Sequence, residues 1–287
     1  MGQLNNNLRI GLPSKGRLSE LSGELLSQAG LNFRRQNRGL FAKVKGLPID
    51  LIFLRTDDIP TLVAEGAIDM GFTGSDLVEE ANANVNTRMR LGVGRCRLAI
   101  CIPDDSPIKS AMDLDGKRIA TSFPNITKAY LGQHNALAHL VSLSGSVEVM
   151  IQLGVADAIV DLVETGSTLA ANRLRIMDEI GSYETVLIQN DRCRDSETAD
   201  RVVRRLEGVV IARDYSLLEY NIPADKLQDA EGITPGFNSP TIGTLEDAQW
   251  RSVRVMVRSD EVIDVMEKLE RLGASAIFQT TISNCRL

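Results

Sequence analysis

The stretch 158–168, AIVDLVETGST, joins an apolar run to two acids and then to three hydroxyl residues around a glycine. Backbone N–H groups of a tight turn that opens a helix can bind a phosphate, and the helix N-terminus adds partial positive charge. The hydroxyls add donors, Gly166 lets the backbone approach closely, and Asp161 can reach sugar hydroxyls or Mg²⁺. The pattern predicts a site for a phosphate monoester. An ordinary strand–turn–helix connection with capping residues also fits it.

Nucleophilic or metal chemistry based on histidine or cysteine has few candidates. The two histidines, His134 and His139, lie five apart in HNALAH, a spacing that turns them to different sides of a helix. No CxxC zinc pattern occurs among the cysteines, which are Cys96, Cys101, Cys193 and Cys285. We therefore expect free thiols and a reaction that does not depend on imidazole.

Composition excludes several protein classes. With 287 residues, 43% of them hydrophobic and 24% charged, the chain suits a soluble protein of two or three domains. An aromatic content of 4% and a net charge of −6 argue against binding nucleic acid or anionic membranes. No apolar run reaches the ~20 residues of a membrane span, and the N-terminus lacks a secretory pattern. These features predict a cytoplasmic protein with neither a membrane nor a nucleic-acid partner.

Short apolar runs alternate with amphipathic stretches through the first two hundred residues, which predicts parallel sheets covered by helices, with ligands at the carboxyl ends of the strands. The expected strands are 8–12, 49–54, 68–72, 96–102, 118–121, 158–161 and 184–189. An internal echo links 62–74 (LVAEGAIDMGFTG) with 151–166 (IQLGVADAIVDLVETG), with Asp69 and Asp157 in the same place, where we expect them to be structural. The echo fits two similar α/β lobes that face each other across a cleft.

The last third predicts the element order βαββαβ of a ferredoxin-like domain. Its best-marked helix lies within 259–273, with Ser259 as the expected cap and Gly273 as the end. We expect three domains: a first lobe (1–92 and 184–208), a second lobe with the phosphate loop (93–183) and the ferredoxin-like domain (209–287).

Ordered motifs along the whole chain resemble the ATP phosphoribosyltransferase family, the first enzymes of histidine biosynthesis. They are LRIGLPSKGRL (8–18), DDIP (57–60), GRCRL (94–98), GKRIATSFP (116–124), the stretch 145–174, TPGFNSPTI (234–242) and LGASAIFQTTISNCRL (272–287). Phosphoribosyltransferases more usually carry two adjacent acids before the loop, whereas Leu162 follows Asp161 here. The match is to the family's long form, which implies a periplasmic-binding-protein-like pair of lobes, a C-terminal histidine-sensing domain and a homo-oligomer, from dimer to hexamer.

The resemblance implies that N1 of ATP displaces pyrophosphate from C1 of phosphoribosyl pyrophosphate, giving phosphoribosyl-ATP. Such a step passes through an oxocarbenium-like state, so the protein must mainly position two polyanions and offset their charge. N1 attacks with its own lone pair and needs no strong base beforehand. Mg²⁺ on the pyrophosphate would assist its departure.

The implied site residues fall into four groups. For phosphoribosyl pyrophosphate they are Asp161, Thr165, Gly166, Ser167, Thr168 and Leu169, with Asp161 and Glu148 as the catalytic acids and metal ligands. Glu148 is equally a carboxylate at a helix start. For ATP they are Lys15, Gly16, Arg17, Asp58, Gly74 and Arg97, although Lys15 and Arg17 also fit a solvated pair and Arg97 an ordinary strand start. For histidine as feedback inhibitor they are Asn221, Thr241 and Ala276. Related chains often have an acid at the position of Asn221, so histidine would be held there with less charge.

Two other functions fit the same two-lobe plan. A bilobal small-molecule receptor, or the effector half of a transcription regulator, would share the lobes but has no need of the 161–169 loop. A catalytically inactive paralogue acting as a regulatory subunit would not need Asp161 or the basic loop at 15–17. The enzyme is favoured over both.

Overall fold

The computed structural model describes residues 7–36 and 39–286 and divides into two compact units. One unit comprises Phe33–Ala199 with the N-terminal residues up to Gly23, and the other comprises Glu24–Asn32 with Asp200–Leu287. Within the described ranges, no helix is long and apolar enough to cross a membrane.

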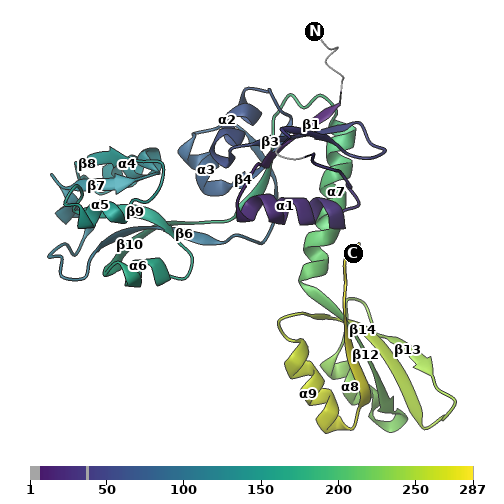
Figure 1. Cartoon of the computed structure of the whole chain (residues 1–287). Helices are drawn as coiled ribbons and strands as arrows, with labels where there is room; N and C mark the ends of the chain where they lie inside the picture. Colours follow the sequence, from purple (N-terminus) through teal and green to yellow (C-terminus); the bar gives the residue numbers. More distant parts are fainter. Residues whose placement is uncertain (1–6, 37–38, 287) are drawn as a thin grey trace. The chain divides into compact units, whose positions relative to one another are not determined.

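The first lobe of the larger unit is built on a six-stranded sheet (Figure 1). In spatial order its strands are β2 (Phe41–Lys43), β3 (Ile49–Leu54), β1 (Leu8–Pro13), β4 (Met70–Gly74), β11 (Thr185–Gln189) and β5 (Asn86–Arg90). The helical segments that belong with it are α1 (Arg17–Gln28), η1 (Thr56–Asp58), α2 (Ile59–Ala64), α3 (Ser75–Glu80) and the start of α7 (Ser196–Arg213). Alternate side chains of β3 are buried, as the apolar alternation of IDLIFL requires.

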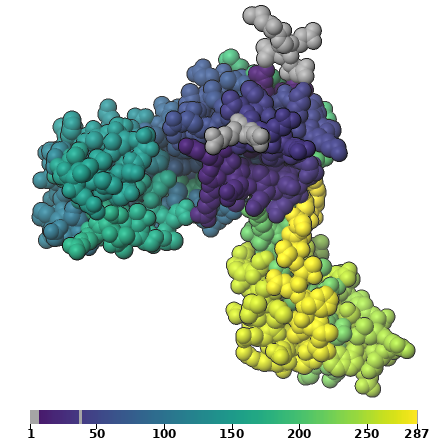
Figure 2. All heavy atoms as spheres, in the orientation of Figure 1, coloured from purple at the N-terminus to yellow at the C-terminus, as the bar shows by residue number. Residues whose placement is uncertain are grey.

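The second lobe holds a five-stranded sheet, and its residues form the teal mass in Figure 2. In spatial order its strands are β10 (Leu174–Tyr183), β6 (Cys96–Pro103), β9 (Ala158–Val163), β7 (Arg118–Thr121) and β8 (His139–Ser142). The helical segments are η2 (Ala111–Leu114), α4 (Pro124–Gln133), α5 (Val149–Gln152) and α6 (Ser167–Ala171). Both faces of the sheet carry buried apolar clusters, one around Ile100 and Val160 and one around Ile159 and Val163.

The prediction of parallel sheets is wrong in part, because both sheets are mixed. Strands β1, β3 and β4 are parallel, as are β7, β8 and β9, but β11 runs antiparallel to β4 and β6 runs antiparallel to β9. The chain enters the second lobe along β6 and returns along β10, and a segment that leaves a sheet and comes back must run against its neighbours. His134 and His139 also do not share a helix, since α4 ends at Gln133 and β8 begins at His139.

A two-segment hinge joins the lobes. The N–H of Leu91 donates to the carbonyl of Thr185, and the N–H of Thr185 donates to the carbonyl of Val93, each at 3.0 Å. The outgoing and returning chains therefore form a short hydrogen-bonded ribbon between the two sheets.

The internal echo is a real structural repeat. In the first lobe the N–H of Asp69 donates to the carbonyl of Arg9 (2.9 Å), while its carboxylate accepts the N–H of Arg9 (2.8 Å). In the second lobe Asp157 makes the same two bonds with Arg118, at 2.8 and 2.9 Å. Each aspartate thereby ties the turn before its own strand to the start of the neighbouring strand, which is the structural role expected of it.

The C-terminal residues form an antiparallel sheet in the order β13-β14-β12-β15. The elements run β12 (Tyr215–Pro223), η3 (Ala224–Lys226), α8 (Leu227–Ile233), β13 (Thr241–Thr244), β14 (Trp250–Arg258), α9 (Val262–Leu272) and β15 (Ser275–Thr281). This is the predicted βαββαβ order, and the core under the helices includes Leu218, Tyr220 and Leu269. Gly273 ends α9 in the left-handed conformation, as predicted, but Ser259 does not cap it and instead lies 3.1 Å from the Ser216 hydroxyl.

Candidate active site

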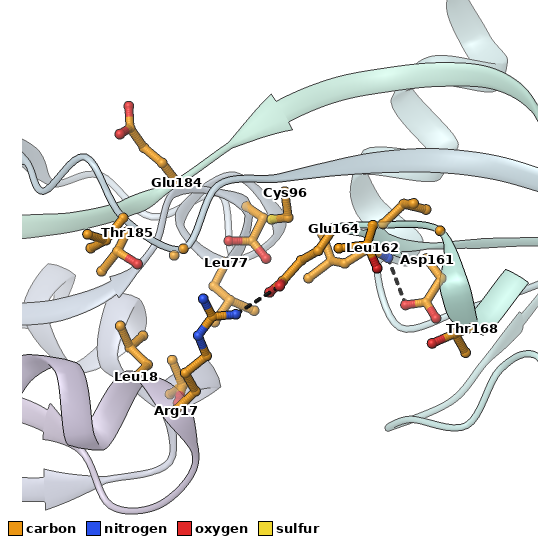
Figure 3. Close-up of a pocket in the computed structure, with 18 of the residues that line it drawn as sticks. Arg17, Leu18, Leu77, Cys96, Asp161, Leu162, Glu164, Thr168, Glu184 and Thr185 are labelled. Atoms are coloured by element: carbon orange, nitrogen blue, oxygen red, sulfur yellow. Dashed lines mark hydrogen bonds and ion pairs between the residues drawn. The ribbon is translucent and has the colours of Figure 1, made fainter. Parts of the chain in front are cut away.

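A cavity of about 800 Å³ opens between the two lobes of the larger unit (Figure 3). The second lobe contributes Glu148 and the whole segment Asp161–Leu169. The first lobe contributes residues that follow its strands and begin its helices, and the hinge between the lobes forms part of the wall. Together with the start of β6 they supply Arg17, Leu18, Leu21, Thr56, Gly74, Asp76, Leu77, Val93, Gly94, Cys96, Glu184 and Thr185. Most of the first-lobe residues lie near the carboxyl ends of parallel strands, where ligands of open α/β sheets bind.

The predicted phosphate loop has the conformation that its glycine allows. Gly166 sits at φ +80°, in the left-handed region, directly before α6. No atom lies within 4 Å of where a Cβ at this position would stand, so the loop is open on that side. The hydroxyls of Thr165 and Ser167 lie 3.1 Å apart, and both residues line the cavity.

Two carboxylates stand beside the loop. Asp161 lies on β9 and accepts a hydrogen bond from the N–H of Leu162 at 2.8 Å. Burial raises the pKa of Asp161, and the negative charge of Glu148 raises it further. Glu148 precedes α5 without a side-chain capping bond, so its carboxylate is left to the cavity. Burial and the nearby like charge both disfavour the ionised form of Asp161.

The cavity wall is strongly acidic. Within the described part of the chain, its lining includes five carboxylates (Asp76, Glu148, Asp161, Glu164 and Glu184) and a single arginine, Arg17. That arginine reaches across from the first lobe to Glu164 of the second, at 2.8 Å, and both side chains are largely exposed (Figure 3). A polyanionic ligand would need accompanying cations to enter.

The structure brings together most of the predicted site residues. Arg17, Gly74, Glu148, Asp161 and Thr165–Leu169 all line the cavity, whereas Lys15, Gly16, Asp58 and Arg97 do not. Lys15, Gly16 and Asp58 are exposed on neighbouring loops. Arg97 pairs with Glu179 and lines an adjoining hollow of about 460 Å³, together with Arg90 and Arg95; Cys96, Val163, Glu164 and Glu184 line both this hollow and the cavity. The binding roles assigned to these residues stay predictions.

Sequence reasoning missed Asp76. This residue is buried, with 6% exposed, and lines the cavity from the first turn of α3. Burial raises its pKa, partly offset by the N–H of Leu77, while the charges of Asp57 and Glu79 raise it further. Gly74 makes room for it, because a Cβ there would lie 2.0 Å from Oδ1 of Asp76. The signal was present in the segment Thr73–Asp76 (TGSD), which repeats three residues of TGST in the phosphate loop.

The three residues predicted to bind histidine lie on the C-terminal sheet. Asn221 on β12 pairs with Ser252 and with Ser275, and Thr241 on β13 pairs with Arg254. Ala276 on β15 adopts φ +49°, which is unusual for a residue other than glycine. Strained backbone of this kind is often found at ligand sites.

The comparisons with known proteins agree with this geometry. A family model described as ATP phosphoribosyltransferase matches residues 55–208, and a second, described as the HisG C-terminal domain, matches residues 212–284. The chain belongs to the ATP phosphoribosyltransferase family. It carries both parts of the long form, as predicted, and the family's transferase reaction is the first step of histidine biosynthesis.

Relatives of the family match nearly the whole chain. An ATP phosphoribosyltransferase of Rhodopirellula baltica is 73% identical over 280 residues, covering 98% of this chain and 94% of its own. One of Bifidobacterium longum is 40% identical over 282 residues, covering 98% and 100%. These similarities favour the transferase over the receptor, the regulator and the inactive paralogue.

Solved structures confirm the two-lobe fold. A chain of the ATP phosphoribosyl transferase (HisG:HisZ) complex from Thermotoga maritima matches with a TM-score of 0.63 at 31% identity, covering 71% of this chain and 98% of its own. ArtJ, an arginine-, lysine- and histidine-binding protein from Geobacillus stearothermophilus, matches with a TM-score of 0.50 at 15% identity, covering 72% and 90%. The second likeness concerns the fold alone and explains why a bilobal receptor fitted the sequence pattern.

Proposed function

We propose that the cavity between the lobes is where N1 of ATP displaces pyrophosphate from C1 of phosphoribosyl pyrophosphate. The observation that carries this proposal is the arrangement of the phosphate loop, Thr165–Thr168, beside Asp161 and Glu148 in one cavity. Loop hydroxyls and N–H groups suit the 5′-phosphate, and the carboxylate of Asp161, near the end of β9, suits the ribose hydroxyls. The sugar would then be fixed at both ends while C1 stays open towards the first lobe.

The donor set fits magnesium. Mg²⁺ usually binds one or two protein carboxylates together with substrate phosphates and water. Glu148 and Asp161 are such a pair, and no group of three or more ligating side chains occurs among the described residues. When bound there, the ion supplies positive charge at the pyrophosphate. Asp161 and Glu148 orient the sugar and hold negative charge near the oxocarbenium-like centre.

On the ATP side we assign Arg17 to the triphosphate. It is the arginine of the cavity wall, and its present partner, Glu164, is an exposed carboxylate that a phosphate can replace. Gly74 also lines the cavity, while Lys15, Gly16, Asp58 and Arg97 lie outside it and would act only if these segments rearrange on binding.

The experiment is an absorbance assay with ATP, phosphoribosyl pyrophosphate, Mg²⁺ and pyrophosphatase, comparing wild type with Asp161→Asn. We expect product from wild type and a loss of about a hundredfold or more in the variant, because the sugar loses its orienting charge. Asp113→Asn is the control, since Asp113 is an exposed acid bonded only to its own loop at Ser110 and Lys109. Equal activity of wild type and Asp161→Asn would remove Asp161 from the reaction.

We also propose that histidine inhibits the enzyme by binding near Asn221, Thr241 and Ala276. We further propose that the chain works in the cytoplasm as a homo-oligomer, between dimer and hexamer. The polar positions Asn221 and Thr241 and the strained backbone of Ala276 support the ligand site. The four free cysteines suit a reducing compartment. Assays and light scattering with and without histidine test these points. Inhibition that Asn221→Ala leaves unchanged would remove Asn221 from the histidine site.

A further inference from the structure

The two loops that face the cavity are counterparts with different charge. Thr73–Asp76 spans the end of β4 and the start of α3, and Thr165–Thr168 leads from β9 into α6. Both run Thr-Gly-Ser, and the serine is the first residue of each helix. The fourth residue is Thr168 in the phosphate loop and Asp76 in the other, and both side chains line the same cavity.

The charge at Asp76 decides what its loop can bind. A carboxylate only accepts hydrogen bonds and repels phosphate, so the first-lobe loop cannot hold an anion as its counterpart does. Asp76 accepts the N–H of Leu77, and no cation pairs with it among the residues that the structure describes. Asp76 is only 6% exposed, its carboxylate accepts the N–H groups of Leu77 and of its own residue, and it lines the cavity, where a donor group of a ligand can also bind it.

The surroundings of Asp76 suit a flat heterocycle. Leu18, Leu21, Leu77 and Val93 line the same cavity as Asp76 and are contributed, like it, by the first lobe and the hinge. Apolar side chains together with a buried acceptor fit an aromatic base that carries an amino group, while Arg17 of the same lobe is left for the triphosphate.

We propose that the carboxylate of Asp76 accepts a hydrogen bond from the exocyclic N6 amino group of adenine and takes up the proton that this group loses in the reaction. The inference rests on the proposed function. As N1 forms its bond to C1, the C1–O bond to pyrophosphate breaks with its electron pair leaving on oxygen. Positive charge then spreads over N1, C6 and N6, and an N6 proton moves to Asp76, leaving a neutral N6 imine; Asp76 later returns the proton to water.

The groups around Asp76 favour this role. Asp57, Glu79, Cys96 and Tyr183 are the titratable groups that interact with it, and burial with the two like charges raises its pKa. Burial also raises the pKa of Cys96 to about 11, so that thiol stays neutral at pH 7. Its raised pKa makes Asp76 the carboxylate of the first-lobe wall best suited to accept a proton.

The test measures binding of two ligands to wild type and to Asp76→Asn, without phosphoribosyl pyrophosphate. ATP carries the N6 amino group, and purine riboside triphosphate lacks it but keeps N1 and the phosphates. We expect wild type to bind ATP at least about tenfold more tightly than the analogue, and Asp76→Asn to lose this preference while its affinity for the analogue changes less than about twofold. With both substrates, kcat of the variant should fall about a hundredfold.

Glu184→Gln is the matched control, because Glu184 is another acid of the wall and is paired with Arg90 at 2.9 Å. It should change the affinities for both ligands by the same factor. Equal weakening of both ligands by Asp76→Asn, or a wild type that does not distinguish them, overturns the inference. The wild-type comparison holds even if the variant fails to fold. Wild type that makes no product at all would instead overturn the proposed function.

Discussion

The two lobes share a local fold at the cavity but present different charges there. Their TGSD and TGST loops begin helices at the same cavity, and they differ in one residue and in the conformation of the glycine, φ −83° at Gly74 and φ +80° at Gly166. In the first loop the glycine makes space for a buried carboxylate, and in the second it gives a turn that leaves the backbone open. The same local fold therefore gives two loops of different charge at one cavity. In our proposals one of them binds the sugar phosphate and the other binds the adenine.

The largest expected effect comes from giving the second loop the charge of the first. Thr168→Asp should lower kcat/KM for phosphoribosyl pyrophosphate about a thousandfold, because a like charge some 4 Å from a phosphate costs about 4 kcal/mol near a protein surface. Thr168→Asn is the neutral match and should lose about tenfold or less. Similar losses in the two variants would show that shape, and not charge, distinguishes the loops.

The repeated aspartates should differ in their contribution to stability. Asp69 is 2% exposed and pairs with Arg194 at 2.9 Å, whereas the Asp157–Arg118 pair has side chains 36% and 44% exposed. We expect Asp69→Asn to lower the free energy of unfolding by about 3 kcal/mol and Asp157→Asn by about 1 kcal/mol or less, measured by urea denaturation. Equal losses would contradict the dependence on burial.

Asp157 also predicts a pH dependence. Hydrogen bonds from Arg118 lower the pKa of Asp157 below its usual value. A lowered folded-state pKa adds stability above the unfolded value, and that stability is lost as the pH falls through the folded-state pKa. The difference in unfolding free energy between wild type and Asp157→Asn should shrink as the pH drops below about 4. A difference that grows on acidification would have the wrong sign.

The two glycines should fail for separate reasons. Gly166→Ala should cost about 1–2 kcal/mol because of the left-handed backbone. Gly74→Ala should cost about 1–3 kcal/mol because its Cβ meets the Asp76 carboxylate. Adding Asp76→Ser should restore the unfolding free energy of Gly74→Ala and leave the loss in Gly166→Ala unchanged. Rescue of both variants, or of neither, would contradict the assigned contacts.

The smallest effect concerns the pair between the lobes. Glu164→Gln frees Arg17 and should lower KM for ATP by up to about fivefold, because exposed pairs are worth about 1 kcal/mol or less. Glu267→Gln removes an equally exposed partner, from Arg271 on α9, and should leave KM unchanged. A rise in KM for Glu164→Gln would mean that the pair assists ATP binding.

The sequence predicted the elements whose stability lies in their own side chains. The strands 49–54 and 118–121 have the predicted bounds; apolar residues mark both ends of the first, and buried Ile119 and Ala120 form the centre of the second. Strands β2, β5 and β8 escaped notice, since they lie at sheet edges, carry mostly exposed or half-exposed residues and are held by pairing with neighbours. In β10, which is also an edge strand, two register shifts interrupt the pairing with β6.

The site divides in the same way. The loop at 161–168 could be singled out because the pattern lies within eight consecutive residues, and the structure places it on the cavity; that it binds phosphate stays a prediction. The position of Asp76 could not be predicted in this way. Only the fold shows that TGSD lines the same cavity as TGST, which begins 92 residues later in the chain. The choice among Lys15, Arg17 and Arg97 likewise depended on which loop faces inward.

The hinge ribbon has a mechanical consequence. Its two segments are bonded side by side through Leu91, Val93 and Thr185, so neither can lengthen or twist without breaking those bonds. Bending across the flat of the ribbon breaks none of them, which leaves the lobes one easy degree of freedom. This bending would move TGSD and TGST together or apart along one arc. Two substrates bound between the loops would then fix the distance between them.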